Sequence, residues 1–452
     1  MNILAVIPYV PTPIRVRPYQ LLRYLAQRGH RLTLATVWES EAEQKSIEDI
    51  RSWGVEVISA PLTQTQKVLN MARAAATGAP IQAWFCHVPE LKLAIEARLA
   101  QGDIEIAHIE HLRGARYALD IQAFVAQHHL QTAVVWDSVD CISHLFEQAS
   151  QRARSWKSKL MTAVELPRTR RYEGFVAAQF PQVLVTSNAD AAALQKLAHN
   201  RATIRTLGNG VDLDYFAPTL DQRQPDTIVF SGKMSYHANI AAALYLTQEV
   251  MPIVWRSRPN TKLVIVGSQP SAQIRALEAQ DSGARVRVTG YVKDLRVSLR
   301  QGSIAAAPLL YGAGIQNKVL EAMACGIPVV GSSQAFSALQ AARGTDCLVA
   351  DTPETFAEAL LNLLNNEGLR QRMGAAGRRF VETHHNWHTI IAELESIYQS
   401  TRNQLNVQQL ISSTPDDVRS NVLSGNGRSS DRNGDRSNDR NSDSAIAAAT
   451  HS

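Results

Sequence analysis

The sequence has few cysteines and no long apolar run. Its four cysteines, Cys86, Cys141, Cys325 and Cys347, lie far apart and form no CxxC or Cys/His cluster, which argues against a disulfide framework and a zinc site. The longest apolar run, residues 3–10, is far below the ~18 residues that a membrane-spanning helix requires. This run also lacks the basic flank of a secretory signal. We therefore expect a buried first strand, a cytoplasmic protein and no bound metal.

Acidic charge is in slight deficit, with 41 Asp and Glu against 46 Lys and Arg, and the net charge is +5. Residues 151–173 alone carry this excess, with seven basic and two acidic side chains. Aromatic residues do not alternate with the bases, so the pattern does not indicate a nucleic-acid partner. Trp156, Leu160 and Val164 recur at helical spacing. The segment is either an amphipathic helix that covers a sheet or one that also touches an anionic membrane.

Short runs rich in Val and Ile alternate with helical patterns along most of the chain, which is typical of parallel βαβ units. Before residue 210 we expect strands at 3–7, 31–37, 55–60, 104–109, 133–136 and 183–186. A stretch with Pro, Asp and Gln at 216–227 indicates a linker. Further strands are expected at 227–230, 262–266, 285–288, 303–307 and 328–330. The sequence thus predicts an α/β protein with two Rossmann-like doubly wound domains, at 1–210 and 227–385, that face a cleft.

The C-terminal part of the chain changes character twice. Residues 386–402 show an apolar face at helical spacing, which requires a packing partner. Residues 424–443 contain only Ser, Gly, Asn, Arg and Asp, which bury no apolar surface. We therefore expect a helix over 386–402 and a disordered tail over 403–452.

The strongest local motif is YGAGIQNKVLEAMACGIPVV at residues 311–330. It predicts a buried strand, a loop with Gly312 and Gly314, and a helix that ends at Gly326. The loop and helix start present backbone N–H groups and a positive dipole end, which favour an anion, although an ordinary strand-to-helix turn has the same pattern. Glu321 lies within this helix among apolar residues, where a carboxylate usually has a partner such as ribose hydroxyls.

Polar residues also follow the expected strands of the first domain, where an open parallel sheet binds ligands. Arg15 and Arg17 follow the first strand and are candidates for phosphate or acceptor binding, or are solvated charges at a helix start. Asp137 and Asp140 follow the fifth strand. Asp140 is equally consistent with a helix N-cap.

Three segments together resemble a known family. GIQNKVLEAMACGIPVV, FSGKMSYHANI at 230–240 and LGNGVDLDYF at 207–216 are similar to the retaining family-4 glycosyltransferases of the GT-B fold. The resemblance covers about residues 2–400 and is closest to sugar transferases associated with exosortase and exopolysaccharide loci. It implies a nucleotide-sugar on the second domain, an acceptor on the first, and a last helix, residues 386–402, that crosses back to the first domain.

The resemblance also assigns residues. Glu321 resembles the ribose-binding second carboxylate of a paired-glutamate motif, and Lys233 stands where the family has a diphosphate-binding Arg. The sequence departs from the family at Ala313, in place of the first Glu, and at Ala238, in place of a Lys. By the same resemblance, His108 and Glu110 approach the donor sugar or acceptor. The alternative is that they form a plain surface cluster. The remaining residues expected to bind the donor are Gly232, Gly312, Gly314, Ile315, Gln316, Asn317 and Lys318.

These features predict a glycosyltransferase that moves a sugar from a nucleotide-diphosphate donor to a hydroxyl of a glycan or lipid-linked acceptor, with retention and without a cofactor or metal. The catalytic candidates are Lys233, Glu321, His108 and Glu110. Two alternatives are open: a sugar-nucleotide 2-epimerase, and a binding-only paralogue that has lost turnover, which Ala313 and Ala238 suggest.

Overall fold

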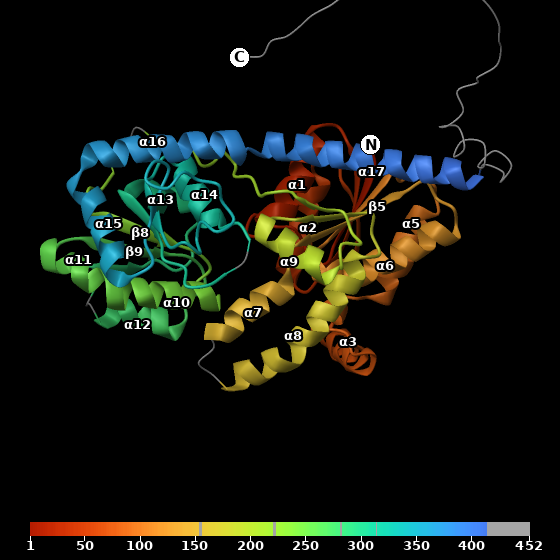
Figure 1. Ribbon diagram of the computed structural model, residues 1–452, viewed down its shortest axis with the longest axis horizontal. Helices are drawn as coiled ribbons and strands as arrows, with labels where there is room; N and C mark the ends of the chain where they lie inside the picture. The colour runs from red at the N-terminus through yellow and green to blue at the C-terminus, as the bar shows by residue number, and fades with distance from the viewer. Residues whose placement is uncertain (153–155, 220–222, 281–282, 313, 414–452) are drawn as a thin grey trace, which may run out of the picture. The chain divides into compact units, whose positions relative to one another are not determined.

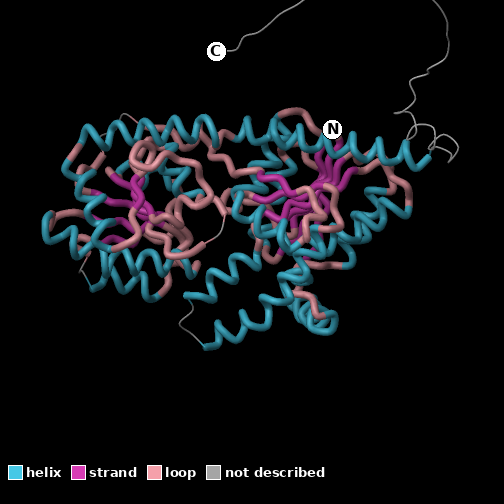
Figure 2. Tube along the Cα trace, viewed as in Figure 1, coloured by secondary structure: helices cyan, strands magenta, loops and turns pink. Residues whose placement is uncertain are grey.

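The computed structural model describes residues 1–152, 156–219, 223–280, 283–312 and 314–413, without the side chains of 149–162 and 408–413. Residues 1–405 form one compact unit and residues 406–452 a second. The first unit contains two parallel sheets flanked by helices (Figure 1, Figure 2). Among the described helices, none is long and apolar enough to cross a membrane.

The first sheet has seven parallel strands in the order β3-β2-β1-β4-β5-β6-β7. These strands are β1 (Asn2–Ile7), β2 (Arg31–Trp38), β3 (Glu56–Pro61), β4 (Ile106–Glu110), β5 (Ala133–Val139), β6 (Gln182–Val185) and β7 (Ile204–Thr206). The intervening helices are α1 (Val16–Gln27), α2 (Glu41–Arg51), α3 (Gln64–Thr77), α4 (Ile81–Phe85), α5 (Pro89–Leu99), α6 (His111–Gln127), α7 (Ile142–Arg152), α8 (Trp156–Ala177) and α9 (Asn188–Leu197). The order reverses direction between β1 and β4, which is where a doubly wound sheet binds its ligand.

The second sheet repeats this design with six parallel strands in the order β10-β9-β8-β11-β12-β13. Its strands are β8 (Thr227–Ser231), β9 (Lys262–Val266), β10 (Val286–Val288), β11 (Ile304–Ala307), β12 (Val329–Gly331) and β13 (Leu348–Val349). Its helices are α10 (His237–Tyr245), a π-helical turn η1 (Leu246–Val250), α11 (Met251–Ser257), α12 (Ala272–Gln280), α13 (Leu295–Gln301), α14 (Asn317–Ala324), α15 (Pro353–Asn365) and α16 (Glu367–His384). The corresponding switch point lies between β8 and β11.

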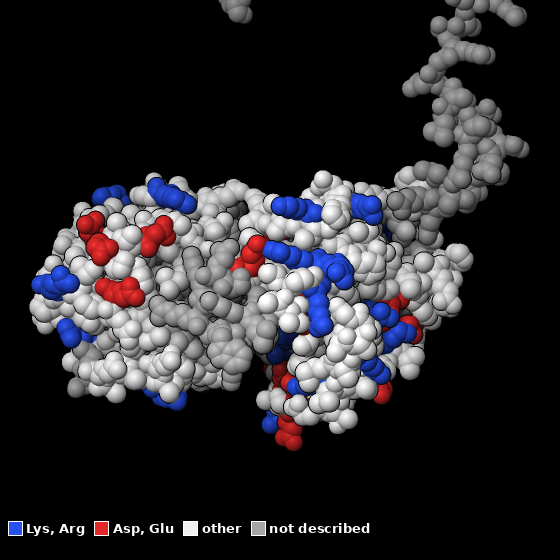
Figure 3. All heavy atoms as spheres, turned by 60° about the horizontal axis from the view of Figure 1, so that its bottom comes forward, with Lys and Arg blue, Asp and Glu red and all other residues white. Residues whose placement is uncertain are grey.

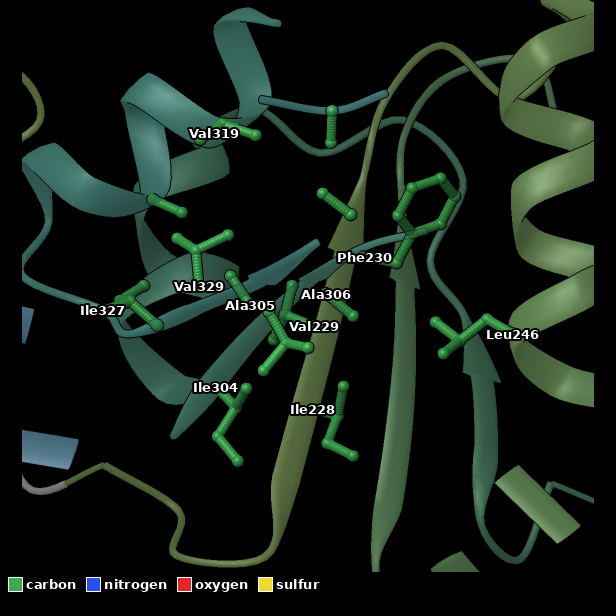
Figure 4. Packing of buried hydrophobic residues seen from close by; sticks show 14 of the residues in the cluster. Ile228, Val229, Phe230, Leu246, Ile304, Ala305, Ala306, Val319, Ile327 and Val329 are labelled. Atoms are coloured by element: carbon green, nitrogen blue, oxygen red, sulfur yellow. The ribbon is translucent and has the colours of Figure 1, made fainter. Parts of the chain in front are cut away.

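The cores explain why these segments are strands. In the second domain every residue of β8 and β11 is buried, because helices cover both faces of the sheet, and such strands read as continuous apolar runs. Figure 4 shows Ile228, Val229 and Phe230 packing beside Ile304 to Ala306, with Val319 of α14 above them. Burial of this kind contributes roughly 1.5–3 kcal/mol for each large apolar side chain. It holds the carboxyl ends of β8 and β11, and hence their loops, in fixed positions.

The last described helix, α17 (Trp387–Ser413), packs on the first domain. Its apolar side chains join a core cluster with β1, α1 and β2, as the position of α17 beside α1 in Figure 1 also shows. The buried members from α17 are Trp387, Ile390, Ile391, Leu394, Ile397 and Tyr398. Because α16 belongs to the second domain, the chain returns to the first domain at Asn386.

The expected fold class, two Rossmann-like α/β domains, is confirmed. Each expected strand coincides with an observed one, but β7 and β13, of three and two residues, were not predicted. The expected helix end at residue 402 is wrong, since α17 continues to Ser413 through a stretch without Pro or Gly. Of the expected tail, residues 414–452 lie outside the described residues.

Candidate active site

The loops after β8 and β9 touch through their backbones. The Gly232 amide donates to the Val266 carbonyl at 3.0 Å, and a side chain at Gly267 would place its Cβ 1.7 Å from the Gly232 carbonyl oxygen. Gly267 has a φ of 151°, so both space and conformation require glycine there. This contact fixes the start of the loop that carries Lys233.

Asn239 of α10 connects the two lysines expected to meet the donor. Its side-chain amide donates to the Lys233 carbonyl at 3.0 Å, and its Oδ1 accepts a hydrogen bond from Lys318 Nζ. The Lys233 side chain is exposed. Burial lowers the pKa of Lys318 to about 8, although the nearby Glu321 opposes that shift. Sequence reasoning missed Asn239 because a lone Asn in a helical pattern carries no distinctive signal.

Glu321 lies one turn after Lys318 on α14. Burial raises the pKa of its carboxyl group to about 7, and the positive charge of Lys318 limits the rise. Within the described part of the chain, its carboxylate makes no hydrogen bond or ion pair. A half-buried carboxylate with free acceptor oxygens suits a ligand that donates hydrogen bonds, such as a diol.

The loop before α14 reaches the first domain. Gly314 has a φ of 65°, and a side chain there would place its Cβ 2.4 Å from Asp140 Oδ1 and 3.2 Å from Thr186 Oγ1. Ile315 approaches Gly208, which follows β7. Among the described residues no side chain caps the start of α14, so its first amides are available to an anion. Gly314, in the loop before α14 that we call the donor loop (residues 308–316), is therefore a neighbour of Asp140 in the first domain.

Arg17 does not have the role that the sequence suggested. Its Nη2 lies 2.6 Å from Asp137 Oδ2, and its Nη1 donates to the carbonyls of Leu207 and Gly208 and to Asn209 Oδ1. The guanidinium is buried, so its donors are used within the protein, and the expectation that Arg17 meets a ligand phosphate is wrong. Arg17 instead holds residues 207–209, which follow β7, against β5. Asn209 in turn donates to Asn317 at 3.4 Å.

His108 and Glu110 lie at the carboxyl end of β4, buried rather than in a surface cluster. Burial lowers the pKa of His108 to about 4, so its ring is neutral at pH 7, and Nδ1 lies 2.9 Å from the Tyr398 hydroxyl of α17. Burial raises the pKa of Glu110 to about 8, so this carboxyl is largely protonated. Its Oε1 accepts from the Tyr9 hydroxyl at 2.8 Å, while Oε2 is buried without a partner among the described residues.

Asp140 faces the donor loop and does not cap α7. Its Oδ1 accepts from Thr186 Oγ1 at 3.1 Å, and burial raises its pKa to about 7. The first amides of α7 donate instead to Glu173 of α8, at 2.6 Å from Ile142 N and 3.0 Å from Ser143 N. The N-cap alternative for Asp140 is therefore wrong, because a carboxylate from another helix occupies that position.

Arg15 stays at the surface of the first domain. Its guanidinium lies over the Tyr9 ring and forms an ion pair with Glu43 at 3.0 Å. Arg15 is thus oriented by its neighbours but remains partly exposed, in the loop between β1 and α1.

The structure also reveals an aromatic group that the sequence did not indicate. The His237 and Tyr311 rings stack with centroids 5.4 Å apart, and His237 Nδ1 lies 2.8 Å from the Tyr311 hydroxyl. Tyr236 adjoins them and is close enough to Asp140 for that carboxylate to raise the pKa of its phenol, after the larger effect of burial. Such rings can stack on a planar base or a sugar face. Only the fold brings them together, since 74 residues separate His237 from Tyr311.

Metal-ligating side chains do not cluster at this site. Across the ranges that the structure describes, no group of three or more His, Cys, Asp or Glu residues is arranged to hold a metal ion. The positive charge that the chain itself places at the site comes from Lys233, Lys318 and the start of α14.

The chain is similar to known glycosyltransferases. Residues 15–215 match the model of Glycosyltransferase Family 4, and residues 225–366 match that of Glycosyl transferases group 1. Sucrose-phosphate synthase from Thermosynechococcus elongatus has the same fold, with a TM-score of 0.65 and 16% identity over 88% of this chain and 99% of that one. Anabaena HepE in complex with UDP-glucose gives a TM-score of 0.61 and 10% identity over 88% and 100%. The fold is that of the GT-B glycosyltransferases.

The two halves of the chain are thus each similar to a glycosyltransferase domain family, and each match covers less than half of the chain. A curated relative, the GDP-mannose-dependent monoacylated alpha-(1-6)-phosphatidylinositol monomannoside mannosyltransferase of Corynebacterium glutamicum, is 29% identical over 216 residues. That match covers 44% of this chain and 56% of the relative, so the chain spans about half the length of the curated relative.

Proposed function

We propose that this protein transfers a sugar from a nucleotide-diphosphate donor to a hydroxyl of a glycan or glycolipid acceptor, with retention, in the synthesis of an exopolysaccharide or another cell-surface glycan. One observation carries the proposal: the glycine loop before α14 lies against Asp140 of the first domain, and the same loop and helix hold Lys318 and Glu321. Groups of the second domain that we expect to bind the donor thus lie next to Asp140, which follows the carboxyl end of β5 in the first domain.

The residues divide the chemistry between them. Glu321 accepts hydrogen bonds from the ribose hydroxyls, and the rings of Tyr236, His237 and Tyr311 offer a stacking surface for the donor. Lys233, with the first amides of α14, balances the charge that grows on the departing diphosphate. The bond from the sugar to the phosphate oxygen breaks as the acceptor oxygen bonds to the same carbon. The departing phosphate oxygen takes the acceptor proton, so no side-chain base and no metal is required.

The buried state of His108 and Glu110 gives them a different role from the one first expected. His108 is neutral and held by Tyr398, and Glu110 is largely protonated and held by Tyr9. Neutral groups at this edge of the sheet donate or accept hydrogen bonds to sugar hydroxyls without a charge penalty. We propose that they shape the floor of the site.

The proposal is tested with a panel of nucleotide-sugars in a thermal-shift measurement. A donor present at 100 times its dissociation constant stabilises the fold by about 2.7 kcal/mol. The correct donor should therefore raise the melting temperature, whereas nucleotides that carry another base and no sugar should not. Product analysis then separates the alternatives. Transfer or slow donor hydrolysis supports the proposal, a 2-epimer of the intact nucleotide-sugar indicates an epimerase, and binding without turnover indicates a binding-only protein.

We further propose peripheral contact with an anionic membrane, which would bring the enzyme to a lipid-linked acceptor from the cytoplasmic side. Several apolar side chains of α3 and α8 are exposed, among them Val68, Leu69 and Val164. They accompany the basic residues of 151–173, of which the side chains of Arg152, Arg154, Lys157 and Lys159 lie outside the described residues. Sedimentation with acidic vesicles at low salt tests this contact, and absence of binding there would exclude it.

A further inference from the structure

A separate pocket of about 1040 Å³ lies entirely within the first domain, between α7, α8 and α9. Its volume reaches the upper end of the ~300–1,000 Å³ typical of small-molecule sites. Its walls come from the start of α7, the second half of α8 and the end of α9. The side of the molecule on which α7 and α8 lie in Figure 1 faces the viewer in Figure 3, where basic side chains gather.

The charge of the pocket is strongly one-sided. Arg170, Arg171, Lys196 and Arg201 line it, against one carboxylate, Glu147. Glu147 forms an ion pair with Arg170 at 2.8 Å. The other three cations form no hydrogen bond or ion pair through their side chains with any residue that the structure describes. Arg171 comes from α8, Lys196 from α9 and Arg201 from the turn after α9, so the three cations are brought together by the packing of separate segments.

Other parts of the same lining are apolar. Pro167, Phe175, Ala178 and Leu197 line the same pocket, and Phe175 is 51% exposed. An exposed aromatic ring beside three unpaired cations fits a ligand with both a phosphate and a hydrocarbon part. A free phosphate or a sugar alone would leave the apolar wall in water.

The helices around the pocket contact one another closely, and the pocket begins next to the candidate active site. Gly174 of α8 lies so close to α9 that a Cβ there would be 2.4 Å from the Leu197 carbonyl oxygen. Glu173 fixes the start of α7 through two backbone amides. Cys141 lines the pocket, and the preceding residue, Asp140, is the one that Gly314 of the donor loop approaches.

We propose that this pocket binds the phosphate of an amphiphilic acceptor, in which a phosphate or phosphodiester joins a hydrocarbon chain to the glycan end. This inference rests on the proposed function, which supplies the need for an acceptor on the first domain. The phosphate lies between Arg171, Lys196 and Arg201, and the first part of the hydrocarbon lies along Phe175. The glycan end then extends past Asp140 toward the donor.

The test measures binding of dihexanoyl phosphatidic acid below its micellar concentration to the full chain by calorimetry. Glycerol 3-phosphate, which lacks the chains, and dihexanoylglycerol, which lacks the phosphate, are the matched ligands. We expect the phosphatidic acid to bind at least tenfold more tightly than either. Equal binding of glycerol 3-phosphate would overturn the amphiphilic part of the proposal, and equal binding of dihexanoylglycerol would overturn the role of the cations.

Variants locate the site. The triple variant Arg171→Gln, Lys196→Gln, Arg201→Gln is expected to lose at least tenfold in affinity for dihexanoyl phosphatidic acid. The control Arg31→Gln, Lys45→Gln, Lys262→Gln removes the same charge from exposed positions outside the pocket and should bind like the unmodified protein. Phe175→Ala should weaken binding of the phosphatidic acid but not of glycerol 3-phosphate. Equal losses in both triple variants would show a general charge effect and refute the site.

The triple variant Arg171→Gln, Lys196→Gln, Arg201→Gln also distinguishes a failure of this proposal from a failure of the proposed function. The pocket variant should retain the melting-temperature shift with the nucleotide-sugar donor, because Lys233, Lys318 and Glu321 are untouched. If no nucleotide-sugar stabilises the unmodified protein, the proposed function fails, whatever the pocket binds. If the donor shift persists in the pocket variant and phosphatidic acid binding is also unchanged, the pocket assignment alone is wrong.

Discussion

Single side chains at the donor end of the site are expected to differ in what they contribute. Glu321→Gln keeps the shape of the side chain but removes the negative charge that accepts from ribose hydroxyls. Loss of a charged hydrogen bond should weaken donor binding by about 1.5–3 kcal/mol, seen chiefly as a higher KM. Because the carboxyl has a pKa of about 7, donor affinity of the unmodified protein should also rise with pH through that range. The variant should lose this dependence, and a variant that keeps it would contradict the assignment.

Lys233→Ala should act on the rate instead. The partner of this cation gains charge only as the bond to the sugar breaks, so kcat should fall roughly tenfold to a thousandfold with a smaller change in affinity. Single-turnover rates at saturating donor measure this directly. The matched control is Lys262→Ala. Lys262 is exposed and lies at the amino end of β9, whereas Lys233 follows the carboxyl end of β8 in the same sheet. An unchanged rate in Lys233→Ala would remove Lys233 from the site.

Glu110 should make the stability of the fold depend on pH. Its pKa is raised from 4.5 to about 8, so the folded state holds a proton that the unfolded state releases. The stabilisation is therefore full below pH 4.5 and is lost as pH rises through about 8. Glu110→Gln keeps an acceptor for Tyr9 and should flatten the fall in unfolding free energy between about pH 6.5 and 8, measured with denaturant. The neighbouring His108 and His111 do not interfere above pH 6.5, because their pKa values are lowered to about 4 and 3 and their rings are largely neutral there in both the folded and the unfolded state.

At the scale of elements, α17 is expected to stabilise the first domain although it follows the second in sequence. Trp387 is fully buried and packs so tightly on Gly210 that a Cβ there would lie 2.7 Å from its ring. Trp387→Ala should therefore cost about 3–5 kcal/mol of unfolding free energy. Trp387→Phe should cost clearly less, because it keeps an aromatic ring and removes a buried indole N–H without a partner among the described residues. Equal losses would show that the ring is not the determinant.

The same helix corrects where the chain can be shortened. Thr401 is buried, and Arg402 forms an ion pair with Glu105 at 2.7 Å. Leu405 packs against the core cluster that α17 shares with β1, α1 and β2. A truncation after Thr401 should therefore remove structural contacts, although the sequence predicted a disordered tail from residue 403.

At the scale of the whole molecule, activity should depend on the approach of the donor loop to the first domain. Gly314→Ala introduces a Cβ only 2.4 Å from Asp140 Oδ1, whereas Gly344→Ala has a similar left-handed φ, 83° against 65°, and no atom within 4 Å. Backbone strain of roughly 1–2 kcal/mol is common to both. We expect comparable stability losses but a selective fall in kcat for Gly314→Ala. A similar kcat in both variants would show that the contact with Asp140 does not matter for turnover.

Local sequence determined the elements of this protein. Runs such as those of β8 and β11 are apolar throughout because both faces of a parallel sheet are covered, and their alternation with helices was enough to predict two doubly wound domains. The glycine loop and helix at 311–330 were also readable, because Gly312, Gly314 and Gly326 mark conformations that few other residues adopt.

Tertiary structure decided which polar residues are available to a ligand. Arg15 and Arg17 look alike in sequence, yet Arg17 is buried and bonded to Asp137 and Asn209, while Arg15 stays partly exposed. The N-cap of α7 comes from Glu173 on another helix, and the stacked rings of His237 and Tyr311 come from distant segments. Such pairings join residues far apart in the chain, and their energies depend on distance and burial, which local spacing does not encode.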